Sequence, residues 1–328
     1  MEEIKRSNMK LDFLGNVVCP LKSIFLKELE LKVEEYRKST GRILKYHIPG
    51  GCGRTDEYDD IWKIDYVDEL PDLIFSKDLG QFVSKEFIVK FIKKGYFKSP
   101  LGKNVHEEFI DAGCIDPEGE YWIYSVAPTV MLIDKIKLGN LPEPRIWNDL
   151  LKPQYKNNII IGGRCGKVSS MLLPYIYKER GEDGLKRLAS NVKDVWSAPD
   201  MAKVTGINNK KGAAINVINW SFAKLCPNRE RVSILWPEDG AVISPFYMLS
   251  KKSKIDELSV ILDIFLGSEY GQKAADMFYP SVNIEVDNHL PENAKFKWLG
   301  WDYVKNNDFE KIKDDCDLIF EKYWEKSR

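Results

Sequence analysis

Apolar residues in the first part of the chain form short runs that alternate with longer segments of helical spacing. The runs LDFLGNVVCP, GRILKYHIP and DLIFS predict three strands. The segment from Pro20 to about Lys38 predicts an amphipathic helix, and a second helix is expected around Phe87 to Ile92. This alternation predicts an α/β fold with parallel strands, in which ligands bind beyond the carboxyl ends of the strands.

The same alternation continues after a long extended stretch, EYWIYSVAPTVMLI, which we interpret as a crossing between two lobes. NIIIGG and GAAINVINW predict further strands, a helix pair is expected to break at Gly267, and the tail from about Asp308 predicts a packed amphipathic helix. We therefore expect two domains. The first lobe comprises residues 1–125 plus 245–328, including the C-terminal helix, and the second comprises residues 126–244.

The turn after NIIIGG is rich in glycine, basic side chains and hydroxyl groups. A strand followed by a turn and then by the start of a helix would direct backbone N–H groups and a positive helix dipole at one point, where an anion could bind. Arg164 and Lys167 would supply charge, and Ser169 or Ser170 would cap the helix. The expected ligand contacts are Gly163, Arg164, Cys165, Gly166, Lys167 and Ser169. The alternative is an ordinary strand-to-helix connection.

Three strand ends in the first lobe carry similar residues. They supply Cys19, the glycine turn with Gly51, Cys52, Gly53 and Arg54, and the pair Ser76 and Lys77. Glycines allow close approach of the backbone to a ligand, so we expect ligand contacts there. A mobile loop is the alternative for the glycine turn.

Cys19, Cys52 and Cys165 each fall at a predicted strand end. Three converging thiolates could bind a soft metal or form a redox centre, whereas isolated cysteines often pack as small hydrophobic residues. Cys114, Cys226 and Cys316 are expected to be structural, and no cofactor is expected.

Composition narrows the class of protein. The 328 residues are 44% hydrophobic and carry 49 basic and 50 acidic side chains, a net charge of -1. This balance argues against nucleic-acid binding, and no apolar run approaches the roughly 20 residues of a membrane span. The N-terminal residues lack the apolar core of a secretory signal, so the chain as written is expected in the cytoplasm, or outside it if a signal was removed or lies in a fused segment. No catalytic triad, Walker loop or dinucleotide motif can be read, and we expect no enzyme activity.

Four further segments carry a family resemblance: WNDLLKP at 147–153, PEDGA at 237–241, SEYGQK at 268–273 and KWLGW at 297–301. In this order and spacing they resemble the solute-binding proteins of ABC transporters, in the branch that binds ferric iron, sugar phosphates, thiamine and polyamines. The resemblance implies the two-lobed type II periplasmic-binding-protein fold, in which each lobe is a mixed sheet flanked by helices and a cleft closes on the ligand. It also implies a monomer that binds a small molecule and a transporter permease.

One departure from the family bears on the ligand. Ferric-binding relatives carry two adjacent tyrosines where this chain has Asn219, Trp220 and Ser221. We therefore expect a small polar anion, a phosphate ester or carboxylate, with Trp220 as an apolar wall and Asp239 orienting a donor. The alternative is a cytosolic enzyme, or a metal or redox sensor, that uses Cys19, Cys52 and Cys165 on the same fold.

Overall fold

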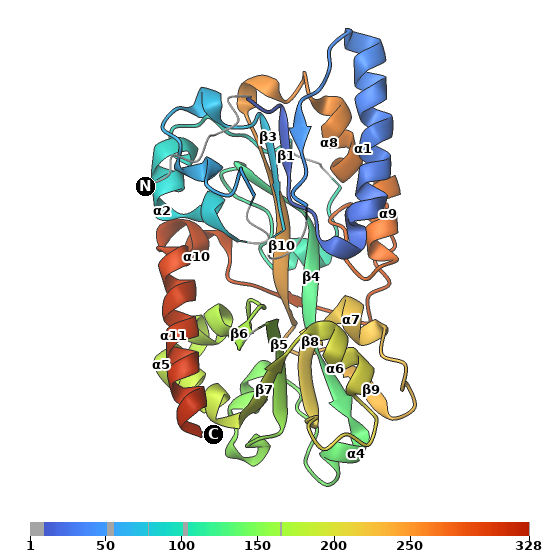
Figure 1. Cartoon of the computed structure of the whole chain (residues 1–328), viewed down its shortest axis with the longest axis vertical. Coiled ribbons are helices and arrows are strands. Elements are labelled where there is room, and N and C mark those ends of the chain that lie inside the picture. Colours follow the sequence, from blue (N-terminus) through green and yellow to red (C-terminus); the bar gives the residue numbers. More distant parts are fainter. Residues whose placement is uncertain (1–9, 51–55, 78, 101–103, 165, 328) are drawn as a thin grey trace. The chain divides into compact units, whose positions relative to one another are not determined.

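The computed structural model describes residues 10–50, 56–77, 79–100, 104–164 and 166–327. The chain divides into two compact units (Figure 1). Unit 1 comprises Met1–His106, Cys114–Ser125 and Pro245–Asn288, and unit 2 comprises Glu107–Gly113, Val126–Ser244 and His289–Arg328. The chain passes between them within β4 (Tyr121–Asp134) and β10 (Ala241–Ser250), so the predicted crossing stretch is one of the shared strands.

Unit 1 contains three short parallel strands in the order β2-β1-β3, with β10 antiparallel to β3. The strands are β1 (Phe13–Gly15), β2 (Tyr46–His47) and β3 (Leu73–Ser76). The helices are α1 (Cys19–Thr40), α2 (Lys85–Phe87), a π-helix (Ile88–Ile92), α8 (Ser259–Leu266) and α9 (Ser268–Ala275), with 3₁₀ turns at Ile61–Lys63, Val67–Glu69, Gln81–Val83 and Lys252–Lys254. The predicted break at Gly267 between α8 and α9 is confirmed.

Aromatic rings join the helices of unit 1 to its strands. Phe265 of α8 stacks on Phe75 of β3 with ring centroids 3.9 Å apart, and Phe25 of α1 lies 5.1 Å from Phe265. All three side chains are almost completely buried. The apolar face predicted for the first helix therefore covers this part of the sheet.

Unit 2 contains a mixed sheet in which β8 lies between β4 and β5. β5 runs parallel to β8 and β7, whereas β4 is antiparallel to β8 and β9. Besides β4, the strands of unit 2 are β5 (Ile159–Arg164), β6 (Lys167–Val168), β7 (Val192–Trp196), β8 (Ile215–Asn219), β9 (Val232–Leu235) and β11 (Phe296–Lys297). The helices are α3 (Glu107–Asp111), α4 (Lys135–Leu138), α5 (Leu172–Asn191), α6 (Ala198–Val204), α7 (Trp220–Lys224), α10 (Trp301–Asn306) and α11 (Phe309–Ser327), with 3₁₀ turns at Trp147–Leu151 and Pro153–Tyr155.

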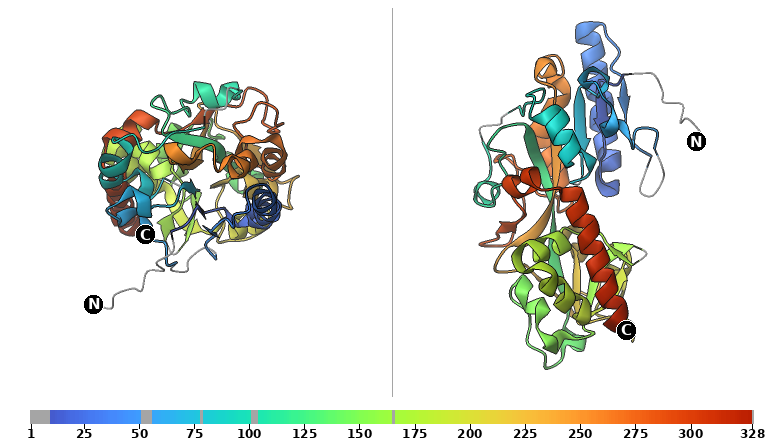
Figure 2. Two further views of the ribbon diagram at one scale, coloured as in Figure 1. Left: turned by 90° about the horizontal axis from the view of Figure 1, so that it is seen from above. Right: turned by 90° about the vertical axis from the view of Figure 1, so that its left-hand side faces the viewer.

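The C-terminal helix α11 packs along α5 inside unit 2 (Figures 1 and 2). Phe309, Cys316, Phe320 and Trp324 form its buried stripe, and the indole N–H of Trp324 donates to the carbonyl of Val192 at 3.0 Å. The division expected from the sequence placed this helix in the first lobe. The two divisions differ because a buried stripe shows that a helix is packed, but not which surface it covers.

Each unit is thus a mixed sheet flanked by helices, as expected. Within the described part of the chain, no helix is both long enough and apolar enough to cross a membrane.

Candidate functional site

Three parallel strands of unit 2 end at the same edge of the sheet. Gly162 on β5 is paired with Trp196 on β7, and Ile161 on β5 is paired with Val217 on β8. Arg164 is the last residue of β5, and Asn219 is the last residue of β8. The structure therefore brings these two predicted ligand contacts to one strand-end edge, the place where ligands bind in parallel α/β sheets.

The turn after β5 is a β-hairpin and not the start of a helix. Gly163 is paired with Val168 across the hairpin, and Arg164 is paired with Lys167. The backbone N–H and the hydroxyl of Ser169 both donate to the carbonyl of Gly162, at 3.0 and 3.2 Å. The expectation that Ser169 caps the helix is wrong, because its hydroxyl is bound back to β5.

The helix itself, α5, begins at Leu172. Its N-cap residue is Met171, and Ser170 accepts only a long bond of 3.4 Å from the N–H of Leu172. Strand β6 thus separates the helix start from the turn after β5. The dipole of α5 is therefore not directed at the turn, and the charge at the turn comes from its side chains.

Arg164 and Lys167 are directly opposite each other in the hairpin, and both are exposed. Like charges in this arrangement repel, because opposite residues project from the same face of the ladder. Lys167 lines a cavity of about 240 Å³ together with Asp314, Asp317 and Glu321 of α11. Arg164 has no carboxylate within ion-pair distance among the residues that the structure describes. Arg164 thus carries a charge at this edge that no acidic residue of the described chain pairs with.

The acidic groups of α11 were not expected near the turn. Burial raises the pKa of Asp317 above its usual range, and the neighbouring Lys313 and Lys167 partly oppose this shift. Nothing in the spacing of α11 connects it to residues 166–168, which lie about 150 positions earlier. Only the packing of α11 on unit 2 places these carboxylates beside Lys167.

The segment after β8 contains both an accessible and an inaccessible part. Asn219 is half-buried, whereas Trp220 and Ser221 are buried, and Trp220 is only 1% exposed. The Trp220 ring meets Trp236 edge to face, with centroids 5.3 Å apart. Trp220 packs in the interior of the described structure, so its predicted role as a ligand wall gains no support from this geometry.

Unit 1 has its own strand-end edge, formed by β2, β1 and β3. Cys19 is exposed at the first position of α1, Ser76 is buried at the end of β3, and Lys77 is half-buried. Among the described residues, no side chain caps α1, and its first turn contains no acidic residue. The N–H of Leu21 donates to the carbonyl of Val18 at 3.0 Å and Pro20 has no N–H, so it is the positive dipole of this long helix that favours an anion.

One histidine and one aspartate side chain flank the predicted glycine turn. His47, at the end of β2, lies with Nε2 2.8 Å from Oδ2 of Asp56, and its ring packs against Tyr58. Gly51, Cys52, Gly53 and Arg54 lie outside the described residues, as does Cys165. The convergence of Cys19, Cys52 and Cys165 therefore stays a prediction.

The other three cysteines are buried, in agreement with their expected structural role. Burial raises the pKa of Cys114 far above its usual range. Burial, together with Asp317 and Asp315, raises the pKa of Cys316 to about 12. The Cys226 thiol donates to the carbonyl of Thr205 at 3.7 Å. Thiols in such surroundings are poor nucleophiles and metal ligands.

Asp239 is held by neighbours within unit 2. Its carboxylate accepts from the backbone N–H of Trp147 at 3.3 Å and pairs with Lys297 at 3.0 Å. The Trp147 indole donates to the carbonyl of Gly240 at 2.8 Å. Burial lowers the pKa of Lys297, but hydrogen bonds with Tyr175 and Asp239 outweigh this effect and raise it. Three of the four family-like segments thus contact one another inside unit 2.

The comparisons with known proteins agree with this architecture. The model of a family described as bacterial extracellular solute-binding protein matches residues 68–307. No curated protein sequence matches the chain. The predicted type II periplasmic-binding-protein fold is confirmed by solved structures, which at these identities show similarity of fold alone.

Three of these structures differ in what their names say they bind. Trichodesmium IdiA (FutA), solved with iron and citrate, has a TM-score of 0.62 at 14% identity and covers 95% of this chain and 98% of its own. The spermidine/putrescine transporter protein PotD of Streptococcus pneumoniae has a TM-score of 0.55 at 16% identity, covering 96% and 100%. AfuA of Actinobacillus pleuropneumoniae, solved with fructose-6-phosphate, has a TM-score of 0.53 at 13% identity, covering 96% and 98%.

The family match extends over well more than half of the chain, and it includes strands and helices of both units. The family is described as one of solute-binding proteins. The chain belongs to the family of bacterial extracellular solute-binding proteins.

Proposed function

We propose that this protein is the receptor of an ABC transporter for a small polar anion, either a phosphate ester or a carboxylate. The family is extracellular by description, which supports the extracytoplasmic alternative for its location and a permease as its partner. AfuA, a protein of the same fold, was solved with a sugar phosphate.

The observation that carries the proposal is the position of Arg164. It lies at the strand-end edge of unit 2, exposed, with a second basic residue opposite it and no acidic partner in the described chain. A guanidinium group offers parallel N–H donors that match two oxygens of a carboxylate or phosphate. An anionic ligand would also relieve the repulsion between Arg164 and Lys167.

The N-terminus of α1 in unit 1 favours the same class of ligand. Anions are stabilised at such a helix end by the dipole. A polyamine would be repelled by the same dipole. The remaining predicted contacts stay part of the proposal: Cys19, Gly51, Cys52, Gly53, Arg54, Ser76, Lys77, Gly163, Cys165, Gly166, Lys167, Ser169, Asn219, Trp220, Ser221 and Asp239.

A thermal-shift screen tests the ligand class. At about 100 times its dissociation constant, a true ligand adds roughly 2.7 kcal/mol to the free energy of unfolding. We expect such a shift with members of a panel of phosphate esters and carboxylates, and none with polyamines. A shift with polyamines or metal ions alone would contradict the anionic ligand.

The variant Arg164→Gln tests the residue. We expect it to weaken binding of the selected anion at least about tenfold, since a charge-assisted contact contributes roughly 1.5 to 3 kcal/mol. Arg187→Gln is the matched control, because Arg187 is exposed in the same unit and paired with Asp183 at 2.7 Å. Equal affinity of both variants would remove Arg164 from the site but leave the receptor function intact.

A further inference from the structure

The opposite end of the unit 2 sheet is strongly basic. Three connections meet there, at residues 135–138, 203–211 and 224–229, and we call them the tip surface. They contain seven basic residues and no acidic residue: Lys135, Lys137, Lys203, Lys210, Lys211, Lys224 and Arg229. Of these, Lys135, Lys203, Lys210, Lys211 and Arg229 are exposed, and none of the five has a carboxylate within ion-pair distance in the described part of the chain.

The acidic residues next to these segments do not neutralise them. Asp134 is 1% exposed and uses its oxygens for backbone N–H groups and for Lys137. Glu230 is flanked by Arg229 and Arg231. A large excess of positive charge therefore remains at this end of unit 2.

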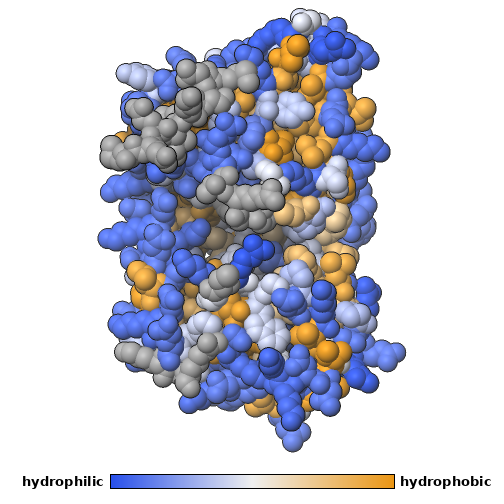
Figure 3. All heavy atoms as spheres, viewed as in Figure 1, coloured by the Kyte–Doolittle hydropathy of each residue, from blue (hydrophilic) through white to orange (hydrophobic). Residues whose placement is uncertain are grey.

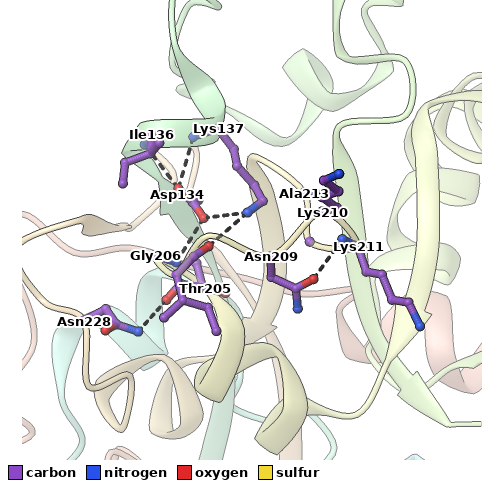
Figure 4. Close-up of polar contacts among 12 residues, drawn as sticks. Asp134, Ile136, Lys137, Thr205, Gly206, Asn209, Lys210, Lys211, Ala213 and Asn228 are labelled. Atoms are coloured by element: carbon purple, nitrogen blue, oxygen red, sulfur yellow. Dashed lines mark hydrogen bonds and ion pairs between the residues drawn. The ribbon is translucent and has the colours of Figure 1, made fainter.

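Hydrogen bonds hold the three segments together (Figure 4). The Asp134 carboxylate accepts from the N–H groups of Ile136, Lys137 and Gly206, at 3.1, 3.1 and 2.9 Å. The Lys137 ammonium donates to the carbonyl of Ile207 at 3.2 Å. The tip surface is therefore connected by bonds between segments that lie about 70 residues apart.

The third segment is joined through the carbonyl of Thr205. This oxygen accepts from the side-chain amide of Asn228 at 2.9 Å and from the Cys226 thiol at 3.7 Å. From β7, Lys193 donates to the carbonyls of Lys210 and Gly212, at 3.1 and 2.9 Å. Bonds to the backbone thus fix the loop that carries the exposed lysines.

Exposed apolar side chains occur within the same three segments. Ile136 is 62% exposed, Ile207 39% and Leu225 67%. They are three of the five large hydrophobic side chains exposed in the described part of unit 2, the others being Ile110 and Leu318. On the face shown in Figure 3, the end of the unit that carries α4 is mostly hydrophilic, with small hydrophobic patches between the polar residues.

Each of these three apolar residues has a lysine beside it or a few positions away in the sequence. Isolated exposed apolar residues are common on soluble proteins, but a group of them among several basic residues is typical of surfaces that contact a membrane. Lysines are attracted to anionic headgroups, and apolar side chains enter the boundary between headgroups and acyl chains.

We propose that the tip surface binds peripherally to an anionic phospholipid bilayer. The lysines bind lipid phosphates electrostatically, and Ile136, Ile207 and Leu225 insert at the interface. Such contact requires no spanning helix. It is independent of the solute site, because the tip surface lies at the opposite end of the unit 2 strands from Arg164 and Asn219.

Flotation of the full chain with vesicles tests the proposal. We expect binding to equimolar phosphatidylglycerol and phosphatidylcholine at about 0.1 M salt, little binding to phosphatidylcholine alone, and release at about 0.5 M salt. The double variant Lys210→Glu and Lys211→Glu should lower the partition coefficient at least about tenfold. Leu225→Ser should lower it severalfold at unchanged net charge.

Matched variants in unit 1 distinguish an effect specific to the tip surface from the effects of net charge and general hydrophobicity on vesicle binding. Lys93→Glu with Lys94→Glu changes an exposed adjacent lysine pair by the same charge, and Leu31→Ser changes a leucine that is 62% exposed. Both should bind vesicles like the unaltered protein. Equal losses in tip and control variants would overturn the proposal, as would binding to heparin without binding to vesicles. Circular dichroism and thermal melting confirm that each variant is folded.

Discussion

Arg164 and Asp134, two charged residues at opposite ends of the unit 2 sheet, have opposite surroundings. At the carboxyl ends of β5 and β8, Arg164 is exposed and has no acidic partner in the described chain. At the opposite end, the Asp134 carboxylate is buried and accepts from three backbone N–H groups. A buried and satisfied charge fixes the backbone, whereas an exposed and unmatched charge is available to a ligand. The difference separates residues that stabilise the unit from residues that bind.

The largest expected effect on stability comes from Asp134→Ala. The substitution leaves three N–H groups without their acceptor, so we expect the free energy of unfolding to fall by about 3 kcal/mol. Urea denaturation measures the change. Asp111→Ala is the control, because Asp111 is exposed in unit 2 at the end of α3 and should change stability by less than about 0.5 kcal/mol. A similar loss in both variants would contradict the contrast between the two ends.

Gly163→Ala tests the hairpin at the carboxyl end. A Cβ at this position would overlap the backbone oxygen of Lys167 and lie 2.5 Å from Cγ1 of Val195, so β6 must move away from β5. We expect a loss of about 2 kcal/mol in unfolding free energy, together with weaker anion binding because Arg164 shifts.

Gly50→Ala serves as the comparison for Gly163→Ala. An added Cβ at Gly50 meets no described atom within 4 Å, so its stability should change by less than about 0.5 kcal/mol. If Gly163→Ala is as stable as Gly50→Ala, the close approach of β5 and β6 does not limit the residue at 163.

The smallest expected effect concerns Asp317, beside Lys167. Its pKa is raised in the folded state, mainly by burial, so the folded protein binds its proton more tightly than the unfolded chain. The resulting stability is present below the ordinary pKa of 3.8 and is lost as the pH rises through the folded pKa. Asp317→Asn should therefore have the same free energy of unfolding as the unaltered protein at low pH and a slightly higher one at pH 7, within the range of about 0.5 kcal/mol that is usual for surface substitutions.

A second substitution, at Lys167, makes the prediction for Asp317 more specific. Its charge lowers the pKa of Asp317, so the benefit of Asp317→Asn at pH 7 should grow when Lys167→Met is already present. Denaturation curves at pH 3 and pH 7 for the four proteins of the double-mutant cycle give the coupling. A benefit that is independent of Lys167 would mean that the two side chains do not interact across the cavity.

The family-like segments show why sequence motifs indicated a fold more readily than a site. Trp147, Asp239 and Lys297 contact one another inside unit 2, and Tyr270 packs against Phe25 and Phe265 in unit 1. These residues hold the fold together, so their spacing is set by packing. A ligand contact needs no such fixed spacing, and its chemistry was read from strand ends alone.

The sequence by itself determined the alternation of strands and helices, the first helix (predicted from Pro20 to about Lys38 and found at Cys19–Thr40), the break at Gly267 and the packed C-terminal helix. Each depends on local periodicity or on a single residue. It also determined that Arg164 and Asn219 lie at strand ends. Only the tertiary structure decided that a hairpin follows β5, that Trp220 is buried and that α11 joins unit 2 beside Lys167. These features depend on contacts between residues far apart in the chain, and local periodicity carries no information about such contacts.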